Sequence, residues 1–109
     1  RAPRAAFQGS KLEGADLAGA NLEGALLADA QLAGVNMFQV HAPHASFDRA
    51  GLRGANFGKA NLLKASFEGA SLADADFRGA NLFEAEFLDA TGSSGQAFEG
   101  ANIKRTKLV

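Results

Sequence analysis

The two histidines are the residues of this chain best suited to bind a metal ion. His41 and His44 stand three positions apart, with Pro43 between them. On an α-helix that spacing places two imidazoles on one face. Here no third histidine or motif carboxylate completes a ligand set. We therefore predict no metal site, and interpret residues 40–44 as a degenerate copy of the repeat described below.

The residue types used in catalysis occur without the partners they need. The chain has no cysteine, so it offers no thiol nucleophile. No serine stands in a nucleophile motif with a histidine and a carboxylate, and no glycine-rich loop of the kind that holds phosphate is present. Acidic side chains are scattered over surface positions, as at Asp16, Asp74, Asp76 and Asp89. We predict that the protein is not an enzyme and has no catalytic residue and no cofactor.

The composition restricts the partners further. The chain has 109 residues, enough for one domain, and 11 Lys and Arg against 12 Asp and Glu give a formal net charge of −1. Nucleic-acid binding requires a field of a single sign, so we expect no nucleic-acid partner. No apolar run approaches the ~18 residues of a membrane span, and no signal peptide is visible, so no membrane contact is predicted. The chain opens Arg1-Ala2-Pro3 without Met, and we expect a processed protein or a module of a longer one.

Large apolar side chains recur at every fifth position. The series lacks a bulky residue only at Ala42, where Met37 or Val40 is expected to fill part of the volume. Alanine usually stands two positions before the bulky residue, Asp, Asn or Ser one before, and Gly often two after. The bulky residues are Phe7, Leu12, Leu17, Leu22, Leu27, Leu32, Met37, Phe47, Leu52, Phe57, Leu62, Phe67, Leu72, Phe77, Leu82 and Phe87.

A five-residue period fits neither regular secondary structure. On an α-helix, successive apolar side chains would point about 140° apart around the axis. In a flat strand, an odd period sends alternate repeats to opposite faces. A short extended segment followed by a corner keeps the bulky residue and the small residue two before it pointing inward. Gly and Asn suit corners that require unusual backbone angles.

The repeats resemble those of pentapeptide repeat proteins. Copies that fit the pattern Ala-(Asp/Asn)-(Leu/Phe)-x-x begin at Ala15, Ala20, Ala55 and Ala80, and the resemblance covers about residues 5–109. It implies an all-β fold, a right-handed quadrilateral parallel β-helix with about 20 residues per coil and coils ~4.8 Å apart. We expect a single domain over residues 1–109.

Residues 20 positions apart should then stack in columns, and the sequence itself supports this. Phe gathers in two opposite columns, which include Phe47 and Phe57, whereas Leu dominates the other two. Residues 91–95 break the frame as an irregular loop, after which Phe98 and Ile103 continue two columns one residue late. The resulting rod is about 24 Å long. About five coils are predicted, over residues 5–24, 25–44, 45–64, 65–84 and 85–105.

Polar residues form a column of their own. Asn21, Asn61, Asn81 and Asn102 are predicted to stack along one edge in a structural role, with His41 interrupting the series. The end coils expose core and unpaired strand edges, and no amphipathic capping helix is visible. We expect a missing N-terminal part or a partner to cover the first coil, and a dimer through a coil end is one form this could take.

The position after each bulky residue should face solvent, yet several of these positions carry apolar side chains. Pro43, Leu63 and Phe83 fall in one column, and Phe38 and Leu88 lie on neighbouring faces. A contiguous exposed apolar strip marks a contact more often than chance, so we predict an interaction surface here, for a partner or for a dimer. The alternative is that Leu63 and Phe83 cover one another, or that residues 91–95 fold over them.

These observations favour a non-catalytic structural or interaction module, a rigid rod that presents a surface to a protein partner or a fused domain. In bacteria the family it resembles occurs fused to other domains, including parts associated with secreted effectors; a cytoplasmic location is otherwise favoured. The alternative that the resemblance implies is inhibition or protection of DNA gyrase by DNA mimicry. That role requires a long acidic rod, whereas this chain is short, has a net charge of −1 and carries Arg49, Arg53, Lys59 and Lys64 on its surface.

Overall fold

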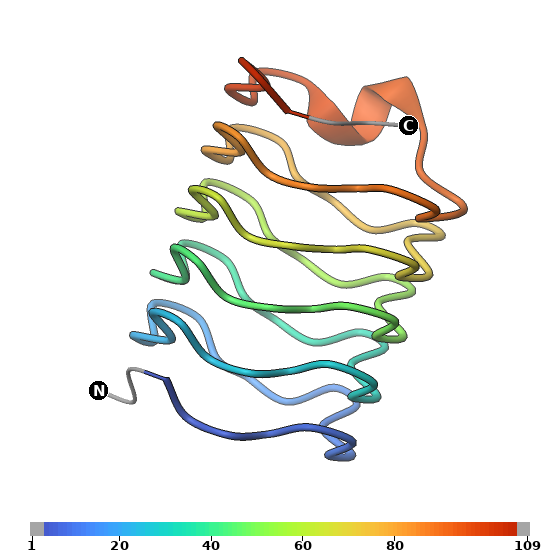
Figure 1. Ribbon diagram of the computed structural model, residues 1–109. Helices are drawn as coiled ribbons and strands as arrows, with labels where there is room; N and C mark the ends of the chain where they lie inside the picture. Colours follow the sequence, from blue (N-terminus) through green and yellow to red (C-terminus); the bar gives the residue numbers. More distant parts are fainter. Residues whose placement is uncertain (1–3, 107–109) are drawn as a thin grey trace.

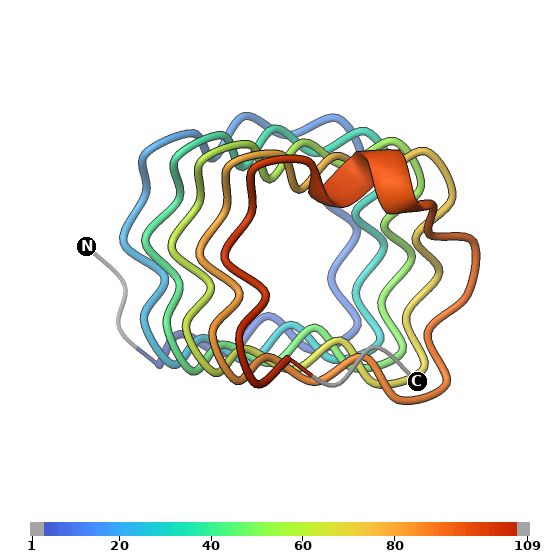
Figure 2. The ribbon, with the colours of Figure 1, turned by 90° about the horizontal axis from the view of Figure 1, so that it is seen from above.

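The computed structural model describes residues 4–106, in which the backbone winds as a parallel β-helix (Figure 1). Parallel bridges join residues 20 positions apart on successive coils, as in the series Leu26, Ser46 and Ser66. Each bridge is a single residue pair, so the described residues contain no extended strand. Seen from above, successive coils repeat the same outline, each displaced a little to one side of the coil before it, so that their corners form rows (Figure 2). The bridges therefore reproduce the 20-residue spacing predicted from the sequence.

A repeat from the middle of the chain shows how each backbone N–H finds an acceptor. The N–H of Asn56 donates to the preceding coil at 2.9 Å, and those of Phe57 and Lys59 donate to the next coil at 2.7 and 2.9 Å. The N–H of Ala55 closes the preceding corner at 3.0 Å. The N–H of Gly58 depends on a side chain, because it donates to Oδ1 of Asn56 at 2.9 Å. This requirement explains the preference for Asn and Asp at the position directly before the bulky residue, which we call the strand position of the repeat.

The degenerate repeat meets the same requirement in another way. His41 occupies the strand position here, and its side chain offers no short acceptor for the corner. The corner residue that would need this acceptor is Pro43, which has no N–H. Inside the coil, Val40 and Ala42 are both 0% exposed. The large and small inward positions are thus exchanged in this repeat, while the backbone still turns with His44 at φ +62°.

Each corner places one residue in the left-handed region of the backbone map. This residue lies two positions after the bulky one, and its φ ranges from +52° at Lys59 to +72° at Gly79. The sequence predicts Gly and Asn here, but the structure also places Arg49, Asp74 and other residues with side chains in this conformation. A left-handed residue other than Gly costs about 1–2 kcal/mol. The hydrogen bonds between coils therefore impose the corner even where the residue type disfavours it.

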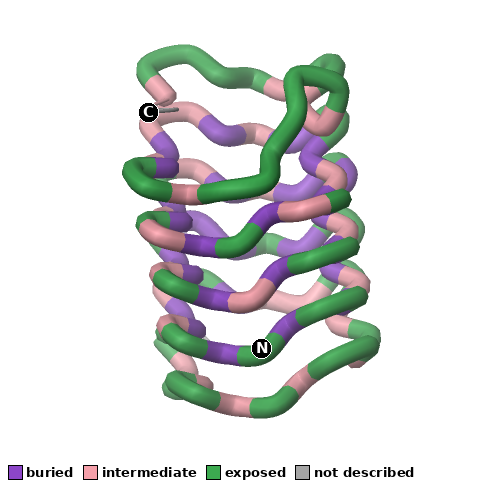
Figure 3. Tube along the Cα trace, turned by 90° about the vertical axis from the view of Figure 1, so that its right-hand side faces the viewer, coloured by how far each residue is buried: buried purple, intermediate pink, exposed green. Residues whose placement is uncertain are grey.

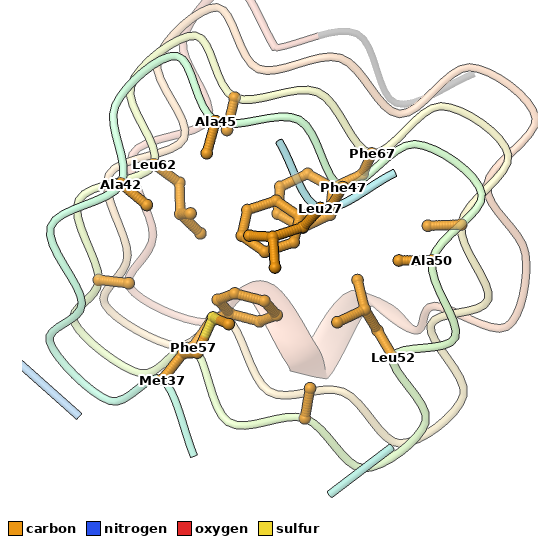
Figure 4. Packing of buried hydrophobic residues seen from close by; sticks show 14 of the residues in the cluster. Leu27, Met37, Ala42, Ala45, Phe47, Ala50, Leu52, Phe57, Leu62 and Phe67 are labelled. Carbon is orange, nitrogen blue, oxygen red and sulfur yellow. The ribbon is translucent and has the colours of Figure 1, made fainter. Parts of the chain in front are cut away.

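Phenylalanine rings form two opposite stacks through the core, and Figure 4 shows Phe47 and Phe67 of one stack facing Phe57 of the other. The ring centroids of Phe47 and Phe67 lie 4.9 Å apart in one stack, and those of Phe57 and Phe77 lie 5.0 Å apart in the other. The two stacks meet edge to face, since Phe47 and Phe57 lie 5.3 Å apart at an interplanar angle of 83°. The ring quadrupole favours both arrangements. The predicted sorting of Phe into two opposite columns is confirmed.

The frame breaks near the C-terminal end of the rod. Thr91 still bridges the preceding coil, the chain then bends, and the 3-10 helix η1 (Gly95–Phe98) follows, which the sequence had not indicated. Phe98 nevertheless stacks on Phe77 with centroids 5.3 Å apart and an angle of 8°. Asn102 bridges the residue 21 positions earlier. The columns therefore resume one residue late, as expected.

Burial is complete only in the middle of the rod (Figure 3). Phe7, Leu12 and Leu17 of the first coil are half-buried, whereas Met37, the next member of the Leu17 column, is 0% exposed. At the other end, Ile103 is 45% exposed. The longest extent of the molecule is 28 Å, so the rod is short, as the repeat count predicts.

Candidate interaction surface

One side of the coil carries a column of amide side chains, and we call it the asparagine side, formed by Asn21, His41, Asn61, Asn81 and Asn102. Nδ2 of Asn102 donates to Oδ1 of Asn81 at 3.4 Å. Nδ2 of Asn61 lies 3.3 Å from Nδ1 of His41. His41 interrupts the run of asparagines, as predicted, but its imidazole keeps a side-chain contact with the next member of the column, Asn61.

The asparagine side ends in a corner lined by apolar side chains. This apolar corner consists of Pro43, Leu63 and Phe83, which lie on successive coils because the N–H of His44 donates to Leu63 O at 2.8 Å and that of Lys64 to Phe83 O at 2.9 Å. Leu63 and Phe83 are half-buried. Pro43 is buried, so its predicted exposure is wrong: it lies in a column between Glu23 and Leu63 of the two adjacent coils.

The other predicted surface residues are separated from the apolar corner. Phe38 is 37% exposed and lies against Gly58, where a Cβ would come within 3.0 Å of the phenylalanine ring. Glycine at position 58 thus leaves room for Phe38, an intramolecular reason for this apolar residue. Leu88 is 45% exposed on a different corner. The structure does not bring the five predicted residues together in one patch.

Two further apolar residues are exposed that sequence reasoning did not select. Leu26 is 40% exposed at a strand position where other repeats carry polar residues, and that departure from the pattern is the signal that could have found it. Ile103 is 45% exposed although its position in the repeat points inward. Ile103 is exposed because it lies at the end of the rod, where the predicted limits of the last coil, residues 85–105, already place it.

Charge is unevenly distributed around the coil. One side of the coil follows the apolar corner along the chain, and this side and the corner that ends it carry five carboxylates and one guanidinium. We call it the acidic side; its charged residues are Asp29, Asp48, Arg49, Glu68, Glu86 and Asp89. Nε of Arg49 donates to Asp29 at 3.1 Å, and this hydrogen bond raises the pKa of Arg49. Arg53, Lys59 and Lys64 lie on the other sides. Of the four cations expected to disturb an acidic stripe, only Arg49 shares this side.

Other charged groups have structural partners. Asp76 accepts the N–H of Arg78 at 2.9 Å, as a corner cap, and also its guanidinium at 2.8 Å. The side-chain hydrogen bond from Arg78 lowers the pKa of Asp76. Glu84 lies 3.6 Å from Lys64 and 3.3 Å from Arg105. These carboxylates stabilise corners and neighbouring coils, which accounts for them without a chemical role.

Within residues 4–106, no three His, Asp or Glu side chains gather as a metal ion requires. His41 points toward Glu23 at 3.9 Å, and His44 occupies a corner. In the same part of the chain, no helix has the length and apolar character to cross a membrane.

The corners, bridges and inward columns repeat every five residues through most of the chain. A family model described as pentapeptide repeats matches residues 5–41, 30–69, 45–82 and 60–91. This chain belongs to the pentapeptide repeat family. Its β-helix is accordingly right-handed, and proteins of the family are generally structural rather than enzymatic. Among curated proteins no match was found.

Several solved structures resemble this chain over most of its length. A pentapeptide repeat protein of the cyanobacterium Cyanothece 51142 is 27% identical over 83% of this chain, with a TM-score of 0.69, and this chain covers 57% of it. A pentapeptide repeat protein of the Arabidopsis thaliana thylakoid lumen is 29% identical over 89% of this chain and 63% of its own, with a TM-score of 0.48. QnrB1, a plasmid-mediated fluoroquinolone resistance protein, is 22% identical over 90% of this chain and 62% of its own, with a TM-score of 0.45. This chain thus spans less than two thirds of the length of each.

Proposed function

We propose that this chain is a non-catalytic interaction module, a single rod of about five four-sided coils that presents the apolar corner to a protein partner or a fused domain. The observation that carries the proposal is the contiguity of Leu63 and Phe83 on successive coils, half-buried beside the half-buried amides of Asn61 and Asn81 on the asparagine side. Interface cores combine apolar and aromatic contacts with a polar rim. The hydrogen-bonded coils supply a rigid scaffold for such a surface.

The neighbouring groups indicate the chemistry of the partner. Phe83 lies between Leu63 on the preceding coil and Lys104 on the next, so the apolar strip ends in a cation. On the asparagine side, Oδ1 of Asn61 and of Asn81 caps its own corner, at 3.2 and 3.1 Å. Because these oxygens are occupied, a partner meets chiefly amide N–H donors, and we propose that it offers apolar side chains beside carbonyl or carboxylate acceptors.

Affinity capture from the source organism tests this proposal. The wild-type protein should retain a partner that the Leu63→Ser/Phe83→Ser variant loses by at least tenfold. The matched control is Ala33→Ser/Ala73→Ser, which alters the same position of the repeat on another corner. The proposal is wrong if the first variant captures the same proteins as the wild type, or if the control loses them equally.

A second function, inhibition or protection of DNA gyrase, is favoured by the acidic side. Five carboxylates against one guanidinium on one side of a rod could imitate a stretch of DNA backbone. We rank this proposal second because the overall net charge is only −1 and the rod is 28 Å in its longest extent. A supercoiling assay decides the ranking: inhibition at micromolar protein, lost on Asp48→Lys/Glu68→Lys substitution, would place gyrase first.

A further inference from the structure

The apolar corner lies between two residues of opposite charge. The N–H of Gly24 donates to Pro43 O at 2.9 Å, which places Glu23 and Pro43 on adjacent coils of one column. The N–H of Glu84 donates to Lys104 O at 3.1 Å and adds Lys104 on the other side of the apolar corner. Over the described residues, this corner column consists of Glu23, Pro43, Leu63, Phe83 and Lys104. It therefore carries a carboxylate, then three apolar residues, then an ammonium group.

The corner column is symmetric in position and complementary in charge about Leu63. Glu23 lies two coils before Leu63 and Lys104 lies two coils after it, each about 10 Å away at the spacing of the coils. A two-fold axis that passes beside Leu63, perpendicular to the rod, relates a second copy to the first. Glu23 of each copy then faces Lys104 of the other, and Phe83 faces Pro43. An interface between two identical chains requires this kind of self-complementarity.

Both charged side chains are available for such a contact. Glu23 and Lys104 are exposed. The carboxylate of Glu23 approaches only the imidazole of His41, at 3.9 Å, and half of its side chain is exposed. Within residues 4–106, Lys104 has no ion-pair partner. Two pairs between the copies would therefore replace no strong interaction within either one.

The neighbouring column of corner residues is compatible with the same arrangement. Lys64 lies nearest to the two-fold axis and would face Lys64 of the second copy. Its charge is compensated within its own chain, because Nζ lies 3.6 Å from Oε1 of Glu84. Farther from the axis, Glu84 of one copy faces His44 of the other, and Arg105 faces Gly24. No pair of like charges in this column meets without a compensating neighbour.

We propose that two copies of this chain form an antiparallel dimer through the apolar corner, with Glu23 of each copy paired to Lys104 of the other. This inference rests on the proposed function, since it names a second copy as the partner of the same corner. A parallel copy would place Glu23 against Glu23 and Lys104 against Lys104, so electrostatic repulsion selects the antiparallel orientation. In the dimer, Leu63 and Phe83 form the apolar centre and the charged pairs form the rim.

The size of the contact sets its strength. The longest extent of the molecule is 28 Å, and one corner is narrower than the shortest extent of 20 Å. The contact therefore buries less than the roughly 1,600 Å² of a standard interface, and the association is weak. A two-fold contact is closed, because each copy uses its only apolar corner. The assembly should consequently stop at two copies.

Sedimentation equilibrium from about 10 μM to about 1 mM tests the dimer and its orientation. The mean mass of the wild type should rise from that of a monomer toward that of a dimer and no further. Glu23→Lys alone and Lys104→Glu alone oppose like charges at both ends of the contact, and each should weaken association about tenfold or more. An equimolar mixture of these two variants should recover it, as should the double variant Glu23→Lys/Lys104→Glu.

The recovery separates a lost contact from a damaged fold, because mixing two misfolded chains cannot restore the interface. Circular dichroism and melting curves check the fold of each variant directly. The matched control is Glu13→Lys, the same change at the same position of the repeat on another corner of the same coil. It should associate like the wild type. Leu63→Ser/Phe83→Ser should remain monomeric.

The outcomes distinguish this dimer from the proposed function. The dimer is overturned if the wild type is monomeric at all concentrations, even where Leu63 and Phe83 are still needed to capture another protein, a result that leaves the proposed function standing. It is also overturned if Leu63→Ser/Phe83→Ser associates like the wild type, if the mixture fails to associate, or if Glu13→Lys weakens association as much as Glu23→Lys. Recovery in the mixture, with the control unaffected, supports it.

Discussion

Replacing Phe57 with leucine tests whether the interleaved rings, rather than apolar burial alone, stabilise the core. Phe57 is 0% exposed and contacts three rings, with centroids 5.3 Å from Phe47, 5.6 Å from Phe67 and 5.0 Å from Phe77. Such pairs contribute about 0.5–1.5 kcal/mol each beyond the area they bury. Leucine keeps most of the buried area, so we expect a loss of about 2–4 kcal/mol in the free energy of unfolding.

The matched control is Phe7→Leu, the same substitution at the same position of the repeat. Phe7 is half-buried, and its column continues with Leu27 rather than with a ring. The expected loss there is below about 1 kcal/mol. Urea unfolding followed by far-UV circular dichroism measures both, since the chain has no Trp or Tyr for fluorescence. If Phe57→Leu costs no more than Phe7→Leu, the argument from ring stacking is wrong.

Four further predictions concern the inward pair, the corners and a charged pair. Val40→Ala should lower the free energy of unfolding by about 1–3 kcal/mol because it leaves a cavity, and Ala42→Leu should lower it by a similar amount because it overpacks the core. The double variant should recover most of the loss. Additive losses in a double-mutant cycle would contradict the exchange of large and small inward positions. Lys59 and Gly54 both occupy left-handed corners, so Lys59→Gly should raise the free energy of unfolding by up to about 1 kcal/mol and Gly54→Ala should lower it by about as much. The effect at position 54 is one of backbone conformation, because the added Cβ would meet only Gly34 N, at 4.0 Å. Thermal melts measure both changes. Asn56→Ala should lower the free energy of unfolding by about 1–2 kcal/mol, because the buried N–H of Gly58 loses its acceptor. His41→Ala should lower it less, because Pro43 has no N–H that needs an acceptor. Equal losses in urea unfolding would refute the argument that the side chain caps the corner. Arg78→Ala should raise the pKa of Asp76 toward its unfolded value of ~3.9. Because the pKa of Asp76 is lowered in the folded protein, its ion pair with Arg78 stabilises the fold fully above the unfolded pKa, and this contribution is lost as the pH falls through the folded pKa. The difference in Tm between Arg78→Ala and the wild type should therefore shrink from pH 7 to pH 3. An NMR titration of the Asp76 carboxyl measures the pKa change directly.

The candidate surface shows where prediction from the sequence stopped. The column of Pro43, Leu63 and Phe83 follows from the 20-residue period alone, because any residues that far apart lie on successive coils. How far each side chain is exposed depends on neighbours from other coils. The burial of Pro43 and the packing of Phe38 over Gly58 therefore could not be read from the repeat pattern.

By itself the sequence determined the coil, its corners and its inward columns, because a five-residue period allows few other ways to bury one bulky and one small side chain per repeat. The tertiary structure decided what the surface offers. Hydrogen bonds between coils force Lys59 and Arg49 into left-handed corners, make His41 part of the amide column and gather carboxylates on one side. These properties arise between residues 20 positions apart, where the register of the coils, rather than the local sequence, sets which groups meet.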